Sequence, residues 1–137
     1  MKNDLKGFEI ATRKIIMYPD LSVTGRLFGG QLLSWIDEAV AMIAMKKTGT
    51  KNIVTKKISE VIFNAPGLLG DVLEIWCKPT KLGESSITLD CHVTVWRSKD
   101  QLHLTICSCS IIYVAINENG RPTIWNHKKT SSQKKGK

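Results

Sequence analysis

The sequence predicts an α+β fold in which a curved antiparallel sheet of about five strands wraps around one long helix. Two patterns in the 137-residue chain lead to this prediction. Between Gln31 and Lys47, apolar residues cover more than half of the helical wheel, which is typical of a largely buried helix. After the helix, apolar and polar residues alternate over long segments, as in antiparallel strands with one packed face. A chain of this length can cover such a helix only if its sheet curves around it.

The expected elements follow one another in the order strand, loop, helix and four strands. Aromatic and β-branched residues predict the first strand at 8–18, and a loop rich in Pro, Ser and Gly follows it. The helix is expected to end near Lys47, with Gly49 as its stop signal. The later strands are expected at 53–63, 71–78, 85–97 and 102–117. In the last strand one phase, expected to be the packed face, is formed by Leu102, Leu104, Ile106, Ile112, Val114 and Ile116.

One domain is predicted at residues 1–125, followed by a basic and disordered tail at residues 126–137. The net charge is +8, and the last ten residues contain five lysines and no acid. A solvated tail is the simpler interpretation, and attraction to a polyanion such as nucleic acid is the alternative, although no recognition motif supports it. No apolar run approaches the ~18 residues of a membrane span, and no secretory signal pattern is present, which predicts a cytoplasmic protein.

The cysteines and histidines give no sign of a metal site or a disulfide framework. All four cysteines fall in strand-like segments, where buried free thiols are expected. Cys107-x-Cys109 lacks a second ligand pair, and His92, His103 and His127 are scattered. No histidine lies in the helix or in the loop before it, which disfavours dehydratase or hydratase chemistry.

The candidate reactive groups lie on the helix itself. Gly29 and Gly30 sit where the helix begins, so another group can approach its free N–H groups, where the helix dipole favours negative charge. Asp37 lies about two turns further on, at the edge of the apolar arc. Glu38 falls on the more polar side and is the weaker candidate. An anion-binding helix start and a carboxylate are the parts that acyl transfer or hydrolysis needs.

Over roughly residues 10–123 the sequence resembles the acyl-CoA thioesterases of the hotdog superfamily, specifically the YciA-like branch. Four motifs in the same order carry this resemblance. They are Gly25-x-Leu27-Phe28-Gly29-Gly30-Gln31 with Asp37 seven positions after the second glycine, Phe63-x-x-Pro66-x-x-x-Gly70-Asp71, Gly83-x-Ser85-Ser86-Ile87, and Asn117-x-Asn119-Gly120-Arg121-Pro122.

The resemblance implies a thioester hydrolase whose catalytic carboxylate is Asp37, acting either as general base on a water or as nucleophile on the thioester. It implies that amides near Gly29 and Gly30 polarise the thioester carbonyl. Relatives usually carry an asparagine at the position of Ser22, which departs from the pattern. That departure keeps a second interpretation open, a non-catalytic protein that binds or senses acyl-CoA.

The resemblance also implies where coenzyme A would lie and how the chain assembles. Gly83, Ser85 and Ser86 match the turn that contacts coenzyme A in relatives, and the cations Lys56, Lys57 and Arg97 are candidates for its phosphates. No cofactor or metal is expected beyond the coenzyme A of the substrate. The fold implies a homodimer as the minimum unit, with a tetramer or a hexamer also open.

Overall fold

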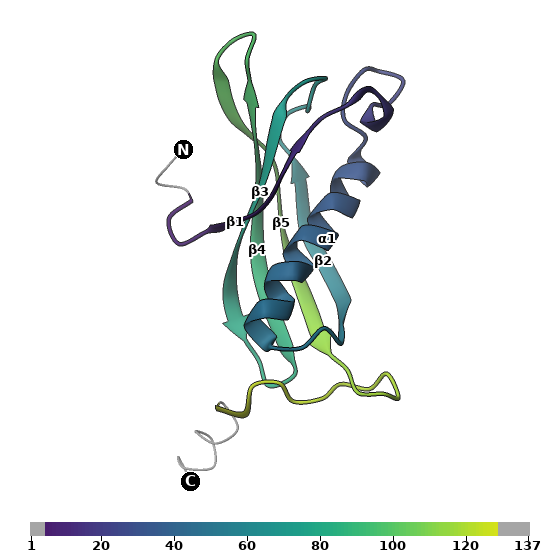
Figure 1. The fold of residues 1–137 in the computed structure, drawn as a ribbon, viewed down its shortest axis with the longest axis vertical. Coiled ribbons are helices and arrows are strands. Elements are labelled where there is room, and N and C mark those ends of the chain that lie inside the picture. Colours follow the sequence, from purple (N-terminus) through teal and green to yellow (C-terminus); the bar gives the residue numbers. More distant parts are fainter. Residues whose placement is uncertain (1–4, 129–137) are drawn as a thin grey trace.

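The computed structural model describes residues 5–128, in which one helix packs across a five-stranded antiparallel sheet (Figure 1). The elements are β1 (Glu9–Ile15), a short 3-10 helix (Tyr18–Asp20), α1 (Gly29–Thr48), β2 (Ile53–Phe63), β3 (Val72–Leu82), β4 (Ser86–Arg97) and β5 (Leu102–Ala115). The strand order β1-β3-β4-β5-β2 puts β1 and β2 at the two edges. This confirms the predicted α+β fold.

Helix α1 begins two residues earlier than predicted and buries one face against the sheet. Its buried residues recur every three or four positions, as the helical period requires; they are Leu32, Trp35, Ile36, Ala39, Val40, Ile43 and Ala44. Gly49 ends the helix in a left-handed conformation with φ 76°, and its N–H donates to the Met45 carbonyl. The opposite face, at Ser34, Glu38 and Met42, is exposed. The sheet of one chain therefore covers the helix on one side only.

The strands match their predicted positions, with differences at their ends. Strand β3 continues to Leu82, beyond the predicted end at residue 78. A register shift between Pro79 and Lys81 accommodates the missing proline N–H, so pairing with β4 resumes at Lys81. Strands β1 and β5 are shorter than predicted.

The predicted packed face of β5 is wrong beyond Ile106. The register between β4 and β5 shifts between Val93 and Thr94, which leaves Ile106 as an extra residue in β5. Because side chains alternate with a period of two, one extra residue moves the rest of the strand to the other face. The residues that face the core are consequently Cys107, Cys109, Ile111 and Tyr113.

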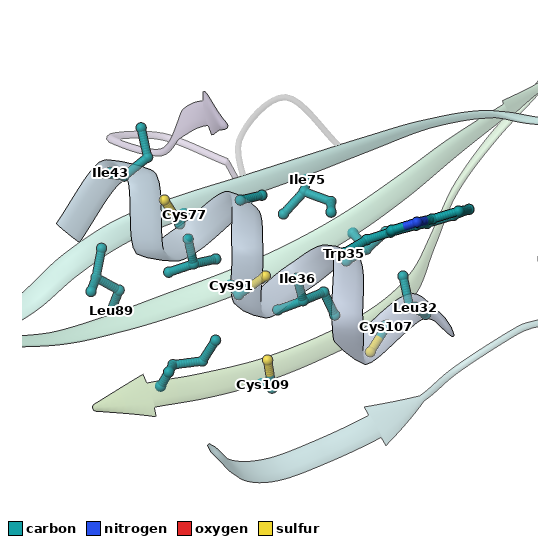
Figure 2. Packing of buried hydrophobic residues seen from close by; sticks show 14 of the residues in the cluster. Leu32, Trp35, Ile36, Ile43, Ile75, Cys77, Leu89, Cys91, Cys107 and Cys109 are labelled. Carbon is teal, nitrogen blue, oxygen red and sulfur yellow. The ribbon is translucent and has the colours of Figure 1, made fainter. Parts of the chain in front are cut away.

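The core between helix and sheet contains all four cysteines as free, buried thiols, as predicted (Figure 2). Cys77, Cys91 and Cys109 lie side by side on adjacent strands, since Cys91 is the register partner of both others. Burial raises the pKa of Cys77 and of Cys107 to about 12. These side chains therefore pack as small apolar groups in the neutral pH range.

The segment after β5 returns over the turn between β3 and β4. The backbone N–H groups of Trp125 and Asn126 donate to the Glu84 carbonyl at 3.0 and 3.2 Å, and the Trp125 indole donates to the Ser86 carbonyl at 3.0 Å. Most of the predicted tail, residues 129–137, lies outside the described residues. In the described part of the chain, no helix is long and apolar enough to cross a membrane.

Candidate active site

Asp37 lies on the side of α1 that faces β2 and β5, where two hydroxyl groups hold its carboxylate. The Thr55 hydroxyl donates to Oδ1 of Asp37 at 2.8 Å. The Tyr113 hydroxyl donates to the same Oδ1 at 3.1 Å and to the Asp37 peptide carbonyl at 2.9 Å. Thr55 and Tyr113 are register partners on adjacent strands, so the sheet presents both donors together. Among residues 5–128, no hydrogen bond to Oδ2 is recorded.

The three residues of this cluster differ in their access to solvent. Tyr113 is 1% exposed, Asp37 is half-buried and Thr55 is exposed at the sheet edge. Burial, together with the negative charge of Asp37, raises the pKa of Tyr113 well above its usual range. The phenol therefore stays protonated and remains a donor. The carboxylate has one held oxygen on the core side and one oxygen available for chemistry.

The start of α1 is open to an incoming acceptor. Phe28 makes no capping hydrogen bond through its side chain, and the first turn contains no acid. Within the described residues, no acceptor is recorded for the N–H groups of Gly29, Gly30 and Gln31. A side chain at Gly30 would project into open space. Free N–H groups at the positive end of a helix dipole suit a carbonyl oxygen that develops negative charge.

Asp37 and the glycines of its own helix do not meet at one point. Asp37 lies seven positions after Gly30 in the helix, which is about 10 Å along the axis. The Phe63 ring lies beside the helix start, 3.4 Å from where a Cβ of Gly29 would be. Phe63 is the last residue of β2, whereas Thr55 is the third residue of that strand. A thioester carbonyl that touches Oδ2 of Asp37 therefore cannot also reach the Gly30 amide of the same chain.

Ser22 lies in the loop that precedes the helix start. Its N–H donates to the Arg26 carbonyl at 2.7 Å, and its hydroxyl pairs with that of Thr24 at 2.8 Å. Gly25 closes the turn with φ 78°, a conformation that favours glycine. All recorded contacts of Ser22 are within this loop, and none reaches Asp37.

The predicted coenzyme A turn lies at the same end of the sheet as Asp37. Ile87, which follows Ser86, is the register partner of Tyr113, so Ser86 lies two strands from Thr55, or roughly 10 Å away. A Cβ at Gly83 would collide with the Ser86 hydroxyl and lie 3.3 Å from the Ser86 carbonyl, so a larger residue would force Ser86 to move. On the edge strand, Lys56 and Lys57 directly follow Thr55 and are both exposed.

Arg97 is placed differently from the other predicted coenzyme A contacts. Its guanidinium forms two hydrogen bonds with the Asp71 carboxylate, at 3.0 and 2.8 Å, and a third with the Pro66 carbonyl at 3.1 Å. Hydrogen bonding to Asp71 raises the pKa of Arg97. Arg97 lies eleven positions after Ser86 in β4, a distance of about 35 Å. Within one chain, Arg97 stabilises the 66–71 turn and is not brought together with Ser86.

Sequence reasoning missed Thr55 and Tyr113. Thr55 stood in a predicted strand without a pattern that marked it as functional. Tyr113 fell on the face expected to be wetter, because the extra residue at Ile106 was not recognised. An aromatic hydroxyl between apolar neighbours was the available signal, since a buried tyrosine requires a hydrogen-bond partner. Separately, no group of His, Cys, Asp or Glu within residues 5–128 is arranged to hold a metal ion.

Comparisons with known proteins identify the family of this chain. The family model of the thioesterase superfamily matches residues 24–102. An uncharacterized acyl-CoA thioester hydrolase of Buchnera aphidicola from Schizaphis graminum is 32% identical over 126 residues, covering 88% of this chain and 91% of that protein. The chain belongs to the thioesterase superfamily.

Further relatives narrow the resemblance. The acyl-CoA thioester hydrolase YciA of Salmonella typhimurium is 29% identical over 125 residues, covering 89% of this chain and 92% of that protein. A hexameric thioesterase of Yersinia pestis superposes with a TM-score of 0.79 at 28% identity, covering 85% and 93% of the two chains. A hexameric hotdog-fold thioesterase of Campylobacter jejuni gives 0.80 at 25% identity, covering 90% and 95%. The predicted hotdog fold and YciA-like resemblance are confirmed.

Proposed function

We propose that this thioesterase hydrolyses acyl-CoA to a carboxylic acid and coenzyme A, with Asp37 as its catalytic carboxylate. The observation that carries the proposal is the Asp37 carboxylate itself, held at Oδ1 by two hydroxyl donors and unpaired at Oδ2. The names of the curated relatives, which are acyl-CoA thioester hydrolases, supply the substrate class.

Two reaction routes use the same oxygen. As a general base, Oδ2 takes a proton from water while the water oxygen bonds to the thioester carbon; the C–S bond then breaks and coenzyme A leaves as its thiol. As a nucleophile, Oδ2 bonds to the thioester carbon itself and expels coenzyme A, and water then hydrolyses the resulting mixed anhydride. Both routes put negative charge on the carbonyl oxygen, which requires nearby N–H donors.

A second copy of the chain supplies those donors in this proposal. The Gly30 amide is about 10 Å from Asp37 within one chain, so the helix start of a partner must approach instead. Strand β2 is the edge where this can happen, because it pairs only with β5 and exposes Val54, Ile62 and Phe63. A homodimer is therefore the minimum unit. The Yersinia and Campylobacter proteins are described as hexamers, which makes a trimer of dimers the expected larger assembly.

Coenzyme A is expected to bind across the β2 edge and the turn at Gly83. Lys56 and Lys57 would attract its phosphates, and Ser85 and Ser86 would donate hydrogen bonds to them. No cofactor other than this substrate group is proposed. Four free, buried thiols are in keeping with a cytoplasmic protein.

The activity is tested by offering acyl-CoA of different chain lengths and measuring release of free thiol. Wild type is expected to turn over at least one member of the panel, and Asp37→Asn is expected to be inactive. Ser22→Asn restores the residue common in relatives and should be as fast as wild type or faster. Binding of acyl-CoA without thiol release by all three proteins would contradict the proposal and support the sensor interpretation. Salt-dependent binding of nucleic acid without thiol release would contradict it as well.

The shared site is tested by mixing two inactive variants. Asp37→Asn keeps a normal helix start, and Gly30→Val keeps a normal carboxylate while its branched side chain blocks the N–H groups. If each site uses Asp37 of one chain and Gly30 of the other, hybrid dimers contain one intact site and activity returns on mixing. If each site lies within one chain, mixing restores nothing.

A further inference from the structure

We propose that Tyr113 is a positioning residue for Asp37, and that it makes Oδ2 the oxygen that reacts. This inference rests on the proposed function and adds to it a residue and an atom. Its basis is the geometry of the Tyr113 hydroxyl, which contacts two acceptors of the same residue.

The Tyr113 hydroxyl has one proton, which it shares between the Asp37 peptide carbonyl at 2.9 Å and the Asp37 Oδ1 at 3.1 Å. The peptide carbonyl is fixed by the helix. A donor that contacts both atoms therefore restricts rotation of the carboxylate relative to the helix backbone. Thr55 adds a second donor to the same Oδ1 at 2.8 Å. With both donors on Oδ1, the carboxylate presents Oδ2 away from the sheet.

The surroundings of Tyr113 make it a permanent donor. Its side chain is 1% exposed, so water does not compete for the hydroxyl. The ionisable groups that face it are Asp37 on α1, Cys91 on β4 and Cys77 on β3. Burial and the Asp37 charge favour the protonated phenol over the phenolate. Since both thiols are themselves uncharged at neutral pH, Asp37 is the charged partner of the phenol.

Thr55 is the less constrained of the two donors. It lies on the exposed edge strand, next to the register shift between Thr55 and Lys57. Its hydroxyl can rotate toward water or toward a bound substrate. Tyr113, in contrast, is enclosed by the core and has its ring packed between the sheet and α1. We infer that Tyr113 sets the orientation of the carboxylate and that Thr55 is free to change partners during the reaction.

Positioning of this kind acts on the chemical step more than on substrate binding. In either route of hydrolysis, Oδ2 must approach the attacking water or the thioester carbon in one direction, and a freely rotating carboxylate spends part of its time in unproductive orientations. Loss of the phenol hydroxyl is therefore expected to lower kcat and leave KM almost unchanged.

The test compares Tyr113→Phe with wild type and with Tyr18→Phe, using the best acyl-CoA of the panel well below the melting temperature of each protein. Tyr113→Phe removes only the hydroxyl and leaves no buried donor unpaired. Its kcat is expected to fall by ~10-fold or more, as for loss of a hydrogen bond to a charged group. Tyr18→Phe makes the same chemical change on a ring that is 79% exposed, and its kcat should match wild type.

A purely structural role for Tyr113 gives a different result. In that case Tyr113→Phe melts at a lower temperature and its kcat is unchanged, which overturns the proposal while wild-type activity upholds the proposed function. An inactive wild type would instead overturn the proposed function. If Tyr113→Phe does not fold, 3-fluorotyrosine labels the only two tyrosines of the chain. Asp37→Asn must then shift the fluorine resonance of Tyr113 and not that of Tyr18, and an unmoved Tyr113 resonance also overturns the proposal.

Discussion

Two aspartates, Asp37 and Asp71, both fall in the motifs on which the predicted resemblance is based, and the structure gives them opposite surroundings. Asp71 is 1% exposed; its carboxylate accepts two hydrogen bonds from Arg97 and one from the Leu68 N–H at 2.9 Å. Asp37 is half-buried, receives neutral donors at Oδ1 and has no counter-ion within the described residues at salt-bridge distance.

A carboxylate with both oxygens hydrogen-bonded stabilises the fold, whereas a carboxylate with one free oxygen is available for chemistry. The Asp71 region closes the 66–71 turn against the loop before the helix, where the Leu27 N–H donates to the Gly67 carbonyl at 2.8 Å. The Asp37 region opens onto an edge strand. Substitutions of the two aspartates should therefore alter different observables, activity for Asp37 and stability for Asp71.

The largest effect is expected for Asp37→Asn. Loss of the carboxylate as base or nucleophile should lower kcat by ~10³-fold, within the range for general acid–base groups. Both hydroxyl donors can still bond to the amide oxygen, so the melting temperature should change little. Thiol release and thermal denaturation measure the two quantities. If Asp37→Asn unfolds, or if it keeps wild-type kcat, then Asp37 is not the catalytic aspartate that the contrast with Asp71 requires.

Asp71→Asn is expected to have the opposite effect to Asp37→Asn, namely a loss of stability with little change in activity. It removes the charged partner of Arg97, whose guanidinium is half-buried, which should lower the free energy of unfolding by ~2 kcal/mol, as for loss of hydrogen bonds to a charged group. Per folded molecule, kcat should stay near that of wild type, because Asp71 makes no recorded hydrogen bond to Asp37 or to the first residues of α1 within residues 5–128. Denaturant titration and thiol release at low temperature test this. A large loss of kcat in the folded variant would instead support the original prediction that Arg97 contacts coenzyme A.

Alkaline pH should weaken the core between α1 and the sheet before it affects the ion pair of Arg97 and Asp71. Burial raises the pKa of Cys77 and Cys107 from 9.0 to about 12. Above pH 9 these thiols ionise in the unfolded chain and stay protonated in the folded one. The stability they contribute is thus complete below pH 9 and is lost as the pH rises toward 12. Each thiol should lower the free energy of unfolding by about 1.4 kcal/mol per pH unit.

Cys77→Ala provides the control for this pH dependence. It should begin less stable than wild type but lose stability less steeply above pH 9, as measured by denaturant titration across the range. Equal slopes for the two proteins would mean that Cys77 ionises in the folded state as easily as in the unfolded one.

The smallest effect on stability is expected for Gly30→Ala, which separates stability from activity within the Asp37 region. A Cβ at this position meets no atom within 4 Å, and alanine favours the helix, so the free energy of unfolding should rise by ~0.5 kcal/mol. The same methyl group hinders approach to the helix N–H groups, so kcat should fall. Ser34→Ala, on the exposed helix face, is the matched control and should leave kcat unchanged. A fully active Gly30→Ala would argue against an oxyanion site here.

Much of this molecule could be predicted from short-range patterns. The helix at 31–47 and the strand at 53–63 follow from residues that are close in the chain, and so does the place of Asp37 on the rim of the apolar arc. These features depend on local periodicity, which a sequence displays directly. The alternation in the strands at 71–78 and 85–97 likewise places Cys77 and Cys91 on the packed faces of those strands.

The partners of the functional groups were decided only by the tertiary structure. Arg97 meets Asp71, and Tyr113 meets Asp37, through contacts between residues 26 and 76 positions apart. One extra residue in β5 selects which face of the strand meets the helix, and therefore whether Tyr113 or its neighbour reaches the carboxylate. Local sequence patterns predict which elements form. The register of the strands depends on every bulge in the sheet, and it determines which side chains these elements bring together.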